Sequence, residues 1–233
     1  LGVLMSVFAI SDLHLSQVHP KPMEIFGQHW QNYMRKIEEC WRDMILPEDT
    51  VLIAGDISWA MKIEDAVPDL ERIRALPGKK VLLRGNHDYW WGSLTRVRAL
   101  AGDMTVIQND AAAVGDIVYC GSRGWLLPGV KDFSKEDRKI FDRELIRLKM
   151  SLDSAVRIAD GRKIAVLTHF PPLDSQGGSD ITRLIEQYPV CAVIYGHIHG
   201  GKTGESNPRV YNGIPYYLTS CDMLGFCPIR IDI

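Results

Sequence analysis

The sequence predicts an α/β protein built on two β-sheets. Short apolar runs alternate with stretches whose apolar residues recur at the helical period, and this alternation is typical of βαβ units. The chain has 233 residues, with no internal repeat and no low-complexity linker. We therefore expect one domain over residues 1–233, long enough to bury a substantial core.

The predicted strands are short apolar runs bounded by turn residues. Five of them lie at Met5–Ile10, Val51–Ala54, Val81–Leu83, Ile164–Leu167 and Cys191–Tyr195. Two further β-like runs lie at Met104–Ile107 and Ile117–Cys120. From about residue 194 onward the chain is rich in Gly, Pro and Tyr, and it contains more short β-like runs.

The clearest predicted helix runs from Trp30 to Ile45. Apolar residues fall there at i, i+3, i+4 and i+7, charged residues fill the other face, and Pro47 ends the helix. Ser134 and Asp137 form a capping-box-like start for a long helix. Apolar periodicity predicts helices over Ile63–Ile73, Ser93–Ala101, Phe141–Val156 and Ile181–Tyr188.

The composition argues against several kinds of partner. Hydrophobic residues make up 46% of the chain and charged residues 24%, as in an ordinary globular protein. A net charge of -2 leaves no basic field to hold nucleic acid. No run approaches the roughly 18 consecutive apolar residues of a membrane span. We expect neither nucleic acid nor a membrane as the partner.

The cysteines suggest a reducing compartment. They are odd in number, scattered, and form no C-x-x-C pair, which argues against a disulfide framework and against a thiolate metal site. The opening LGVLMSVFAI lacks the basic region and the cleavage site of a secretory leader, so we interpret it as a strand, with Met5 as a candidate natural start. We expect a cytoplasmic protein.

Side chains that can bind metal follow five of the predicted strands. The strands end in Ser11-Asp12-Leu13-His14, Gly55-Asp56, Gly85-Asn86-His87-Asp88, Thr168-His169 and Gly196-His197-Ile198-His199. Ligands of open α/β sheets bind beyond the carboxyl ends of the strands, so these loops can converge on one crevice. Imidazole, carboxylate and amide oxygen suit Mn, Fe, Zn or Ni.

Each of these motifs alone has a plainer interpretation. A D-x-H or a G-D can be a turn, G-N-H-D can be a turn with glycine in a left-handed conformation, and one histidine at a strand end is more often a core residue. All five together, in order and at strand ends, favour a metal site. His19 and His29 lie outside the set, and we assign them no role.

The ordered set D-x-H, G-D, G-N-H-D, H, G-H-x-H resembles that of the calcineurin-like metallophosphoesterase superfamily. The resemblance implies a four-layer αββα sandwich with two mixed β-sheets and two divalent or trivalent transition metal ions. One metal would be held by Asp12, His14 and His199, the other by Asn86, His169 and His197, with Asp56 bridging them. GDISWAMK, LLRGNHDYWW and GSRGW look most like a bacterial and archaeal group of predicted phosphohydrolases.

The resemblance also implies the chemistry, which is hydrolysis of a small-molecule phosphomonoester or phosphodiester by a hydroxide held between two metals. His87 resembles the family histidine that protonates the leaving group or stabilises the transition state, and Asp88 would orient it. Arg123 is either a contact to a substrate phosphate or a structural arginine.

The sequence departs from two better-known branches of this superfamily, and these departures narrow the range of possible substrates. Ile57, Ser58, Trp59 and Ala60 replace the acidic and arginine-containing extension of protein Ser/Thr phosphatases, and Trp59 stands where purple acid phosphatases have a ligand tyrosine. Cleavage of a cyclic nucleotide or of a nucleotide pyrophosphate stays open. A nuclease, or a non-catalytic scaffold like the retromer subunit, fits less well because no basic tract is present and no ligand is missing.

The substrate would be chosen by the loops that rim the crevice, which we expect at 16–28, 90–93, 124–133 and 171–179. Trp90, Trp91 and Trp125 could stack on a base, but we favour packing of loops against the sheet.

Overall fold

The computed structural model describes residues 5–174, 177–200 and 207–233. The interpretation of residues 1–4 therefore lies outside the described residues, as do positions 175 and 176 of one predicted rim loop.

The first sheet combines the N-terminal strands with one strand from the C-terminus. It consists of β1 (Val7–Ala9), β2 (Thr50–Ala54), β3 (Lys79–Leu83), β4 (Thr105–Ile107) and β11 (Ile229–Ile231). Their spatial order is β11-β1-β2-β3-β4. The strands β1 to β4 run parallel and β11 pairs antiparallel with β1, so the sheet is mixed.

The second sheet is also mixed. It consists of β5 (Ala111–Val114), β6 (Ile117–Ser122), β7 (Lys163–Thr168), β8 (Val190–Tyr195), β9 (Arg209–Tyr211) and β10 (Ile214–Leu218). The order is β5-β6-β7-β8-β10-β9, in which β6, β7, β8 and β10 are parallel and the two edge strands are antiparallel to their neighbours.

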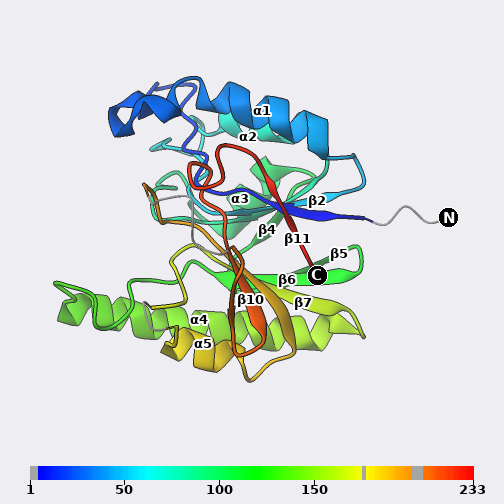
Figure 1. The fold of residues 1–233 in the computed structure, drawn as a ribbon, viewed down its shortest axis with the longest axis vertical. Coiled ribbons are helices and arrows are strands. Elements are labelled where there is room, and N and C mark those ends of the chain that lie inside the picture. Colours follow the sequence, from blue (N-terminus) through cyan, green and yellow to red (C-terminus); the bar gives the residue numbers. More distant parts are fainter. Residues whose placement is uncertain (1–4, 175–176, 201–206) are drawn as a thin grey trace.

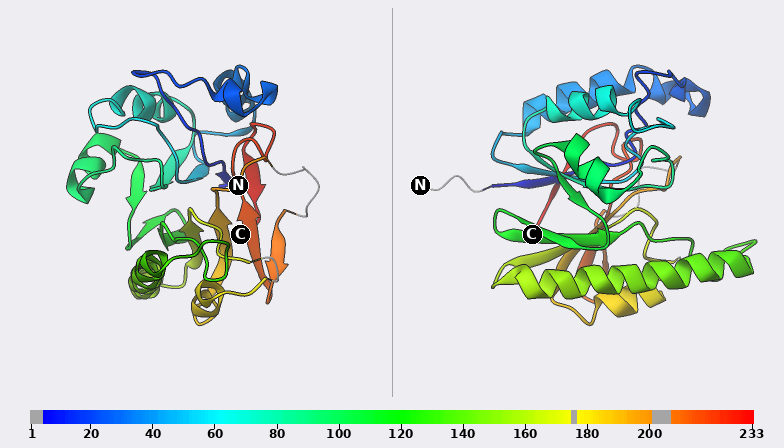
Figure 2. Two further views of the ribbon diagram at one scale, coloured as in Figure 1. Left: turned by 90° about the vertical axis from the view of Figure 1, so that its left-hand side faces the viewer. Right: turned by 180° about the vertical axis from the view of Figure 1, so that it is seen from behind.

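The helices form the two outer layers (Figures 1 and 2). The α-helices are α1 (Tyr33–Met44), α2 (Val67–Arg74), α3 (Leu94–Ala101), α4 (Lys135–Ala159) and α5 (Asp180–Ile185). Figure 1 shows α1, α2 and α3 over the first sheet and α4 and α5 over the second. The four-layer αββα sandwich expected from the sequence is therefore confirmed.

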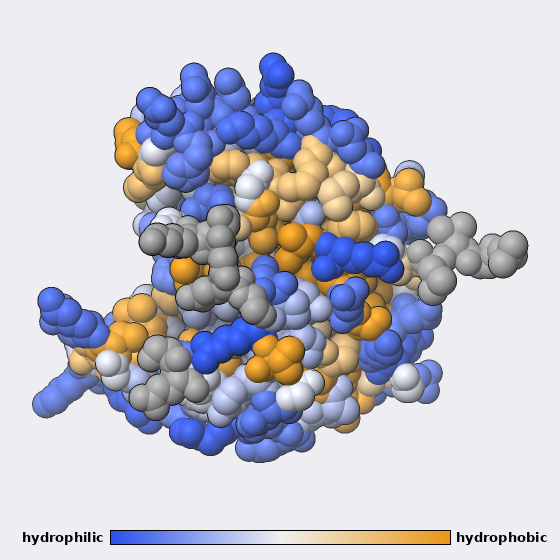
Figure 3. Space-filling view, in the orientation of Figure 1, coloured by the Kyte–Doolittle hydropathy of each residue, from blue (hydrophilic) through white to orange (hydrophobic). Residues whose placement is uncertain are grey.

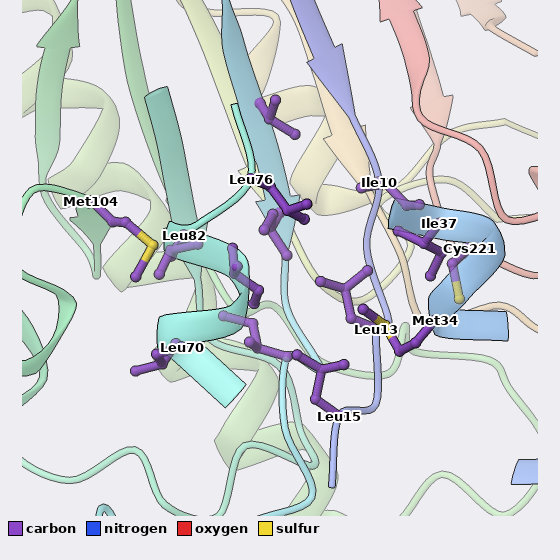
Figure 4. Close-up of a cluster of buried hydrophobic side chains, with 14 of the residues drawn as sticks. Ile10, Leu13, Leu15, Met34, Ile37, Leu70, Leu76, Leu82, Met104 and Cys221 are labelled. Carbon is purple, nitrogen blue, oxygen red and sulfur yellow. The ribbon is translucent and has the colours of Figure 1, made fainter. Parts of the chain in front are cut away.

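The central strands are mostly apolar because they are covered on both faces. Successive side chains of a strand point to opposite faces. In β2, Val51 and Ile53 pack under the helices, whereas Leu52 and Ala54 face the other sheet. Figure 4 shows part of the first of these clusters, where Ile37 of α1 lies near Ile10 and Cys221, and Leu82 of β3 lies near Met104.

On the molecular face of Figure 3, hydrophilic side chains cover the top and bottom, and apolar ones gather across the middle.

The two sheets are joined at their carboxyl ends by the segment after β10. The backbone N–H of Ser11 donates to the carbonyl of Thr219 (2.7 Å), and that of Thr219 donates to the carbonyl of Tyr195 (2.8 Å). The Ser11 hydroxyl is 2.7 Å from that of Thr219 and accepts from the N–H of Ala54 (2.8 Å). These bonds link β1 and β2 of one sheet to β8 of the other beside the loops that carry the predicted ligands.

The structure corrects two expectations. The helix predicted from Trp30 begins at Tyr33, because Trp30 ends a 3-10 helix, η2 (Gln28–Trp30), and Asn32 takes a left-handed conformation with φ 55°. The edge strand β5 was not predicted, since its Ala-rich sequence carries little β signal. The cysteine spacing argued against a disulfide framework, and the described residues hold one disulfide, between Cys40 of α1 and Cys227, while Cys120, Cys191 and Cys221 are free. The capping box of Ser134 and Asp137 is confirmed at the start of α4.

Among the described residues, no helix is both long enough and apolar enough to cross a membrane.

Candidate metal centre

The loops after five parallel strands bring the predicted ligands to one edge of the paired sheets. The first sheet supplies Asp12, His14, Asp56 and Asn86. The second sheet supplies His169, His197 and His199. The structure thus brings together side chains that are up to 187 positions apart in the sequence (199 minus 12).

One group of ligand atoms belongs to Asp12, His14 and His199. The Nε2 atom of His199 lies 3.5 Å from Nε2 of His14 and 3.5 Å from Oδ1 of Asp12. Atoms that bind one metal ion at about 2.1 Å lie about 3 to 3.5 Å from each other. The spacing and the donor types of this group therefore fit one transition metal ion.

A second group belongs to Asn86, His169 and His197. Oδ1 of Asn86 lies 2.7 Å from Nε2 of His169 and 2.9 Å from Nδ1 of His197, and these two nitrogens are 3.3 Å apart. Three donor atoms of different residues converge here on one point, so this group also fits an ion.

Two carboxylates lie between the groups. Oδ2 of Asp56 is 3.9 Å from Nε2 of His14 and 3.4 Å from Nε2 of His169. Ligand atoms of Asp12, Asp56 and His169 all lie within 4.8 Å of one another. Asp56 therefore contacts both groups, as a bridging ligand must, and Asp12 lies close to both.

The backbone around these carboxylates is strained and tightly packed. Asp12 and Asp56 have φ values of 58° and 52°, a conformation that non-glycine residues seldom adopt and that is often found at functional sites. A Cβ atom at Gly85 would collide with the carboxylate of Asp56, and one at Gly196 with that of Asp12. Gly85 is thus needed for close approach rather than for the left-handed turn that the sequence suggested.

The carboxylates draw positive charge into both groups. Burial alone would lower the pKa of His169, but the charge of Asp56 raises it to about 9. Burial likewise opposes protonation of His199, yet Asp12 and Asp222 raise its pKa to about 10. By contrast, burial lowers the pKa of His14 to about 4. The carboxylates thus favour positive charge in both groups, which suits a site for cations.

In two of the imidazoles, the ring nitrogen that faces away from the cluster has a hydrogen-bond partner that orients the ring. Nδ1 of His169 is 2.9 Å from the carbonyl oxygen of Ala54, which leaves Nε2 to face Asp56 and Asn86. Nδ1 of His199 is 2.8 Å from Oδ1 of Asp222. Such partners fix the tautomer of a ligand histidine and raise its basicity. Asp222 was not predicted, because no metal-binding motif surrounds it in the sequence.

His87 lies beside the cluster, but its expected contact to Asp88 is not formed. The Asp88 carboxylate is fully buried and accepts from the N–H groups of Ile57 (2.9 Å), Ser58 (3.0 Å) and Gly85 (2.7 Å) and from the Trp90 indole (3.0 Å). It therefore ties the loop after β2 to the loop after β3. Nδ1 of His87 instead lies 3.2 Å from the hydroxyl of Tyr89.

Arg123 lies after β6, next to the second ligand group. Its carbonyl accepts from the N–H of His169 (3.0 Å). Its guanidinium lies 3.9 Å from Glu144 and over the ring of Trp125, 4.7 Å from the centroid. It lines a cavity of about 110 Å³ together with Arg84 and Arg147. Arg123 thus has structural partners and also faces a space rich in guanidinium groups.

Two cavities open beside the cluster, one at each ligand group. A cavity of about 290 Å³ has His14, His87 and His199 in its wall, with Met23 and Phe26 of the predicted rim loop 16–28. The other measures about 520 Å³. Its wall includes His197, Phe170, Pro171, Leu173 and the segment 125–130, which belongs to the predicted rim loop 124–133.

The aromatic residues divide between packing and the cavities. Trp90 and Trp91 are buried, and their indoles donate to Asp88 and Gln108, so packing explains both. Trp125 lines the larger cavity. Trp59 stacks on His14, with 4.8 Å between ring centroids, and lines the smaller cavity with Trp30. The sequence analysis treated Trp59 only as a missing tyrosine ligand.

A comparison with protein families gives one match over most of the chain. Residues 5–201 match the family model described as calcineurin-like phosphoesterase. No curated protein sequence matches the chain.

Solved structures of the same fold cover nearly the whole chain. The TT1561 protein of Thermus thermophilus is 12% identical, with a TM-score of 0.59 and coverage of 99% of both chains. The phosphopantetheinyl hydrolase of Mycobacterium tuberculosis is 14% identical, with a TM-score of 0.57 and coverage of 97% of this chain and 95% of its own. A protein of unknown function from Aquifex aeolicus is 14% identical with the same coverage and a TM-score of 0.52. At these identities the likeness concerns the fold alone.

Proposed function

Because the chain belongs to the calcineurin-like phosphoesterase family, we propose that it hydrolyses a small-molecule phosphomonoester or phosphodiester at a centre of two transition metal ions. The single observation that carries this proposal is the convergence of seven candidate ligand side chains from both sheets, with Asp12 and Asp56 at their centre.

Each ion has its own set of protein ligands in this proposal. Asp12, His14 and His199 would hold one, Asn86, His169 and His197 the other, and Asp56 would bridge them. When bound, the two ions supply charge that polarises the phosphoryl oxygens and lowers the pKa of water. Mn, Fe, Zn and Ni all suit this mixture of imidazole, carboxylate and amide ligands.

His87 is the proposed acid for the leaving group. Its ring lies beside the cluster, with 5.8 Å between its centroid and that of the His14 ring. The backbone N–H of His87 donates to Oδ1 of the proposed bridge Asp56 (2.8 Å). The backbone therefore holds His87 in a fixed relation to the centre, while its imidazole stays partly exposed to the cavity beside it. Asp88 acts as a positioning residue for the two loops, and Arg123 as a candidate contact to a substrate anion.

The cavity of about 520 Å³ next to His197 favours a phosphodiester as the second candidate. A diester has two organic groups, and a second space beside the centre can hold the one that stays on phosphorus. A nucleotide pyrophosphate also carries two substituents on the attacked phosphorus, and a cyclic nucleotide is a diester whose two ester oxygens belong to one sugar.

The experiment is a substrate panel with purified protein and Mn²⁺, covering phosphomonoesters, aryl phosphodiesters, cyclic nucleotides and nucleotide pyrophosphates. We expect turnover of at least one class that disappears with a chelator and returns with Mn²⁺. Bound metal without turnover of any class would contradict the proposal and would favour a non-catalytic scaffold.

A further inference from the structure

The cavity of about 290 Å³ beside His87 is built from apolar and aromatic side chains. Met23 and Trp30 are almost fully buried, with 4% and 2% of their surface exposed. Phe26 is 59% exposed and lines the same cavity. These three residues belong to the 3-10 helices η1 (Met23–Phe26) and η2 (Gln28–Trp30), which stand in the chain between β1 and α1.

The opposite side of the cavity is the proposed catalytic centre itself. His14, His87 and His199 line it, and Trp59 lies between the first two of these rings, with centroid distances of 4.8 Å to His14 and 4.4 Å to His87. The ring of Trp30 is 6.4 Å from that of His14 and 6.1 Å from that of His199. A group in this cavity is therefore in contact with both the metal ligands and the proposed acid.

The position of His87 decides which part of a substrate enters. If His87 protonates the leaving oxygen, the atoms attached to that oxygen must lie on the His87 side of the phosphorus. That side is this cavity. The inference rests on the proposed function, because it takes the acid role of His87 as given.

The wall of the cavity offers few polar side chains to a polyhydroxylated group. Apart from the histidines of the centre these are His29 and Asp222, and the carboxylate of Asp222 already accepts from Nδ1 of His199 (2.8 Å) and from the N–H of Gly200 (3.0 Å). A sugar or polyol would lose hydrogen bonds to water and gain few in return. A flat apolar ring would instead bury its surface against Met23, Phe26 and Trp30.

We propose that this cavity binds the leaving group of the substrate and that the leaving group carries an aromatic ring. The centre then selects aryl or arylalkyl phosphoesters over esters of small alcohols or of polyols.

The test compares two esters of similar leaving-group acidity, 3-phenylpropyl phosphate and propyl phosphate, with the Mn²⁺-loaded protein. Each is offered as the monoester and as its methyl diester, and the alcohol released is identified. Burial of a phenyl ring predicts a kcat/KM about 10- to 100-fold higher for the phenyl ester. Phe26→Ala should lower that preference several-fold.

Ile25→Ala is the matched control. Ile25 is the neighbour of Phe26 in η1 and is 75% exposed, but it does not line the cavity. It should leave the preference unchanged. Met23→Ala is a second cavity variant and should also lower the preference, while two bound metal ions per chain in each variant show that the centre is intact.

Equal kcat/KM for the phenyl and propyl esters would overturn the inference, as would equal effects of Phe26→Ala and Ile25→Ala. In both cases turnover of the esters would leave the proposed function standing. If no phosphoester is hydrolysed with Mn²⁺, the proposed function fails, and the inference fails with it.

Discussion

The two halves of the ligand cluster each contain one histidine that the fold holds in a different way. The His169 side chain is fully buried, and a backbone carbonyl, that of Ala54, faces its Nδ1. The His199 side chain is 34% exposed, and its Nδ1 depends on the side chain of Asp222, although Asp12 and His14 of the same half are buried. We infer that the half that contains His199 exchanges its metal more readily, because its exposed histidine can leave the metal first.

The largest expected effect comes from the residue that joins the two halves. Asp56→Asn removes the charge shared by both proposed ions, so it should weaken both metals and abolish turnover. Metal content and kcat measured on the purified variant check this. Asp49→Asn is the matched control, since Asp49 is a buried carboxylate at the other end of β2 that accepts from the N–H groups of Ser6 and Leu46. If Asp56→Asn keeps most of its activity, Asp56 is not the bridge.

The next effect separates chemistry from metal binding. His87→Ala should lower kcat on an alkyl ester by about 100- to 10,000-fold, the usual range for general acid catalysis, while metal content stays the same. The loss should be smaller on a p-nitrophenyl ester, whose leaving group needs less protonation. Equal losses on the two esters would point to transition-state stabilisation by His87, and loss of one metal would make it a ligand.

The smallest effect tests the half that contains His199. Asp222→Ala removes the partner of Nδ1 of His199, and loss of such a partner typically weakens metal binding by about 10- to 100-fold. Titration of the metal-free protein with Mn²⁺ should show this weakening for one of the two ions. Asp180→Ala, which removes an exposed carboxylate paired with Arg183 (3.1 Å), should leave both affinities unchanged. Equal weakening of both ions in Asp222→Ala would remove the distinction between the halves.

The ligand set could be predicted from the sequence because each ligand follows a recognisable strand. A strand such as Val51–Ala54 is short and apolar, and its carboxyl end must lie at the same sheet edge as those of its parallel neighbours. The ligands could therefore be predicted from the position of each motif relative to a strand. The prediction held for ligands from both sheets to the extent that the structure brings them together.

The supporting contacts could not be predicted in the same way. Asp222 lies next to His199 because the strand before it, β10, pairs parallel with β8. No local sequence pattern predicts this pairing of strands. The disulfide between Cys40 and Cys227 depends likewise on how the C-terminal strand β11 returns to β1. The cavity residues Met23 and Phe26 lie in a 3-10 helix, which has no long apolar period to detect.

The most direct test of the central claim is the metal content of the purified protein. After growth with Mn²⁺ or Fe²⁺, elemental analysis should find two transition metal ions per chain in the unaltered protein. His199→Ala should retain one ion, since the half that contains His169 stays complete. A protein that contains no transition metal after such growth, and that adding Mn²⁺ or Fe²⁺ does not activate, would contradict the account.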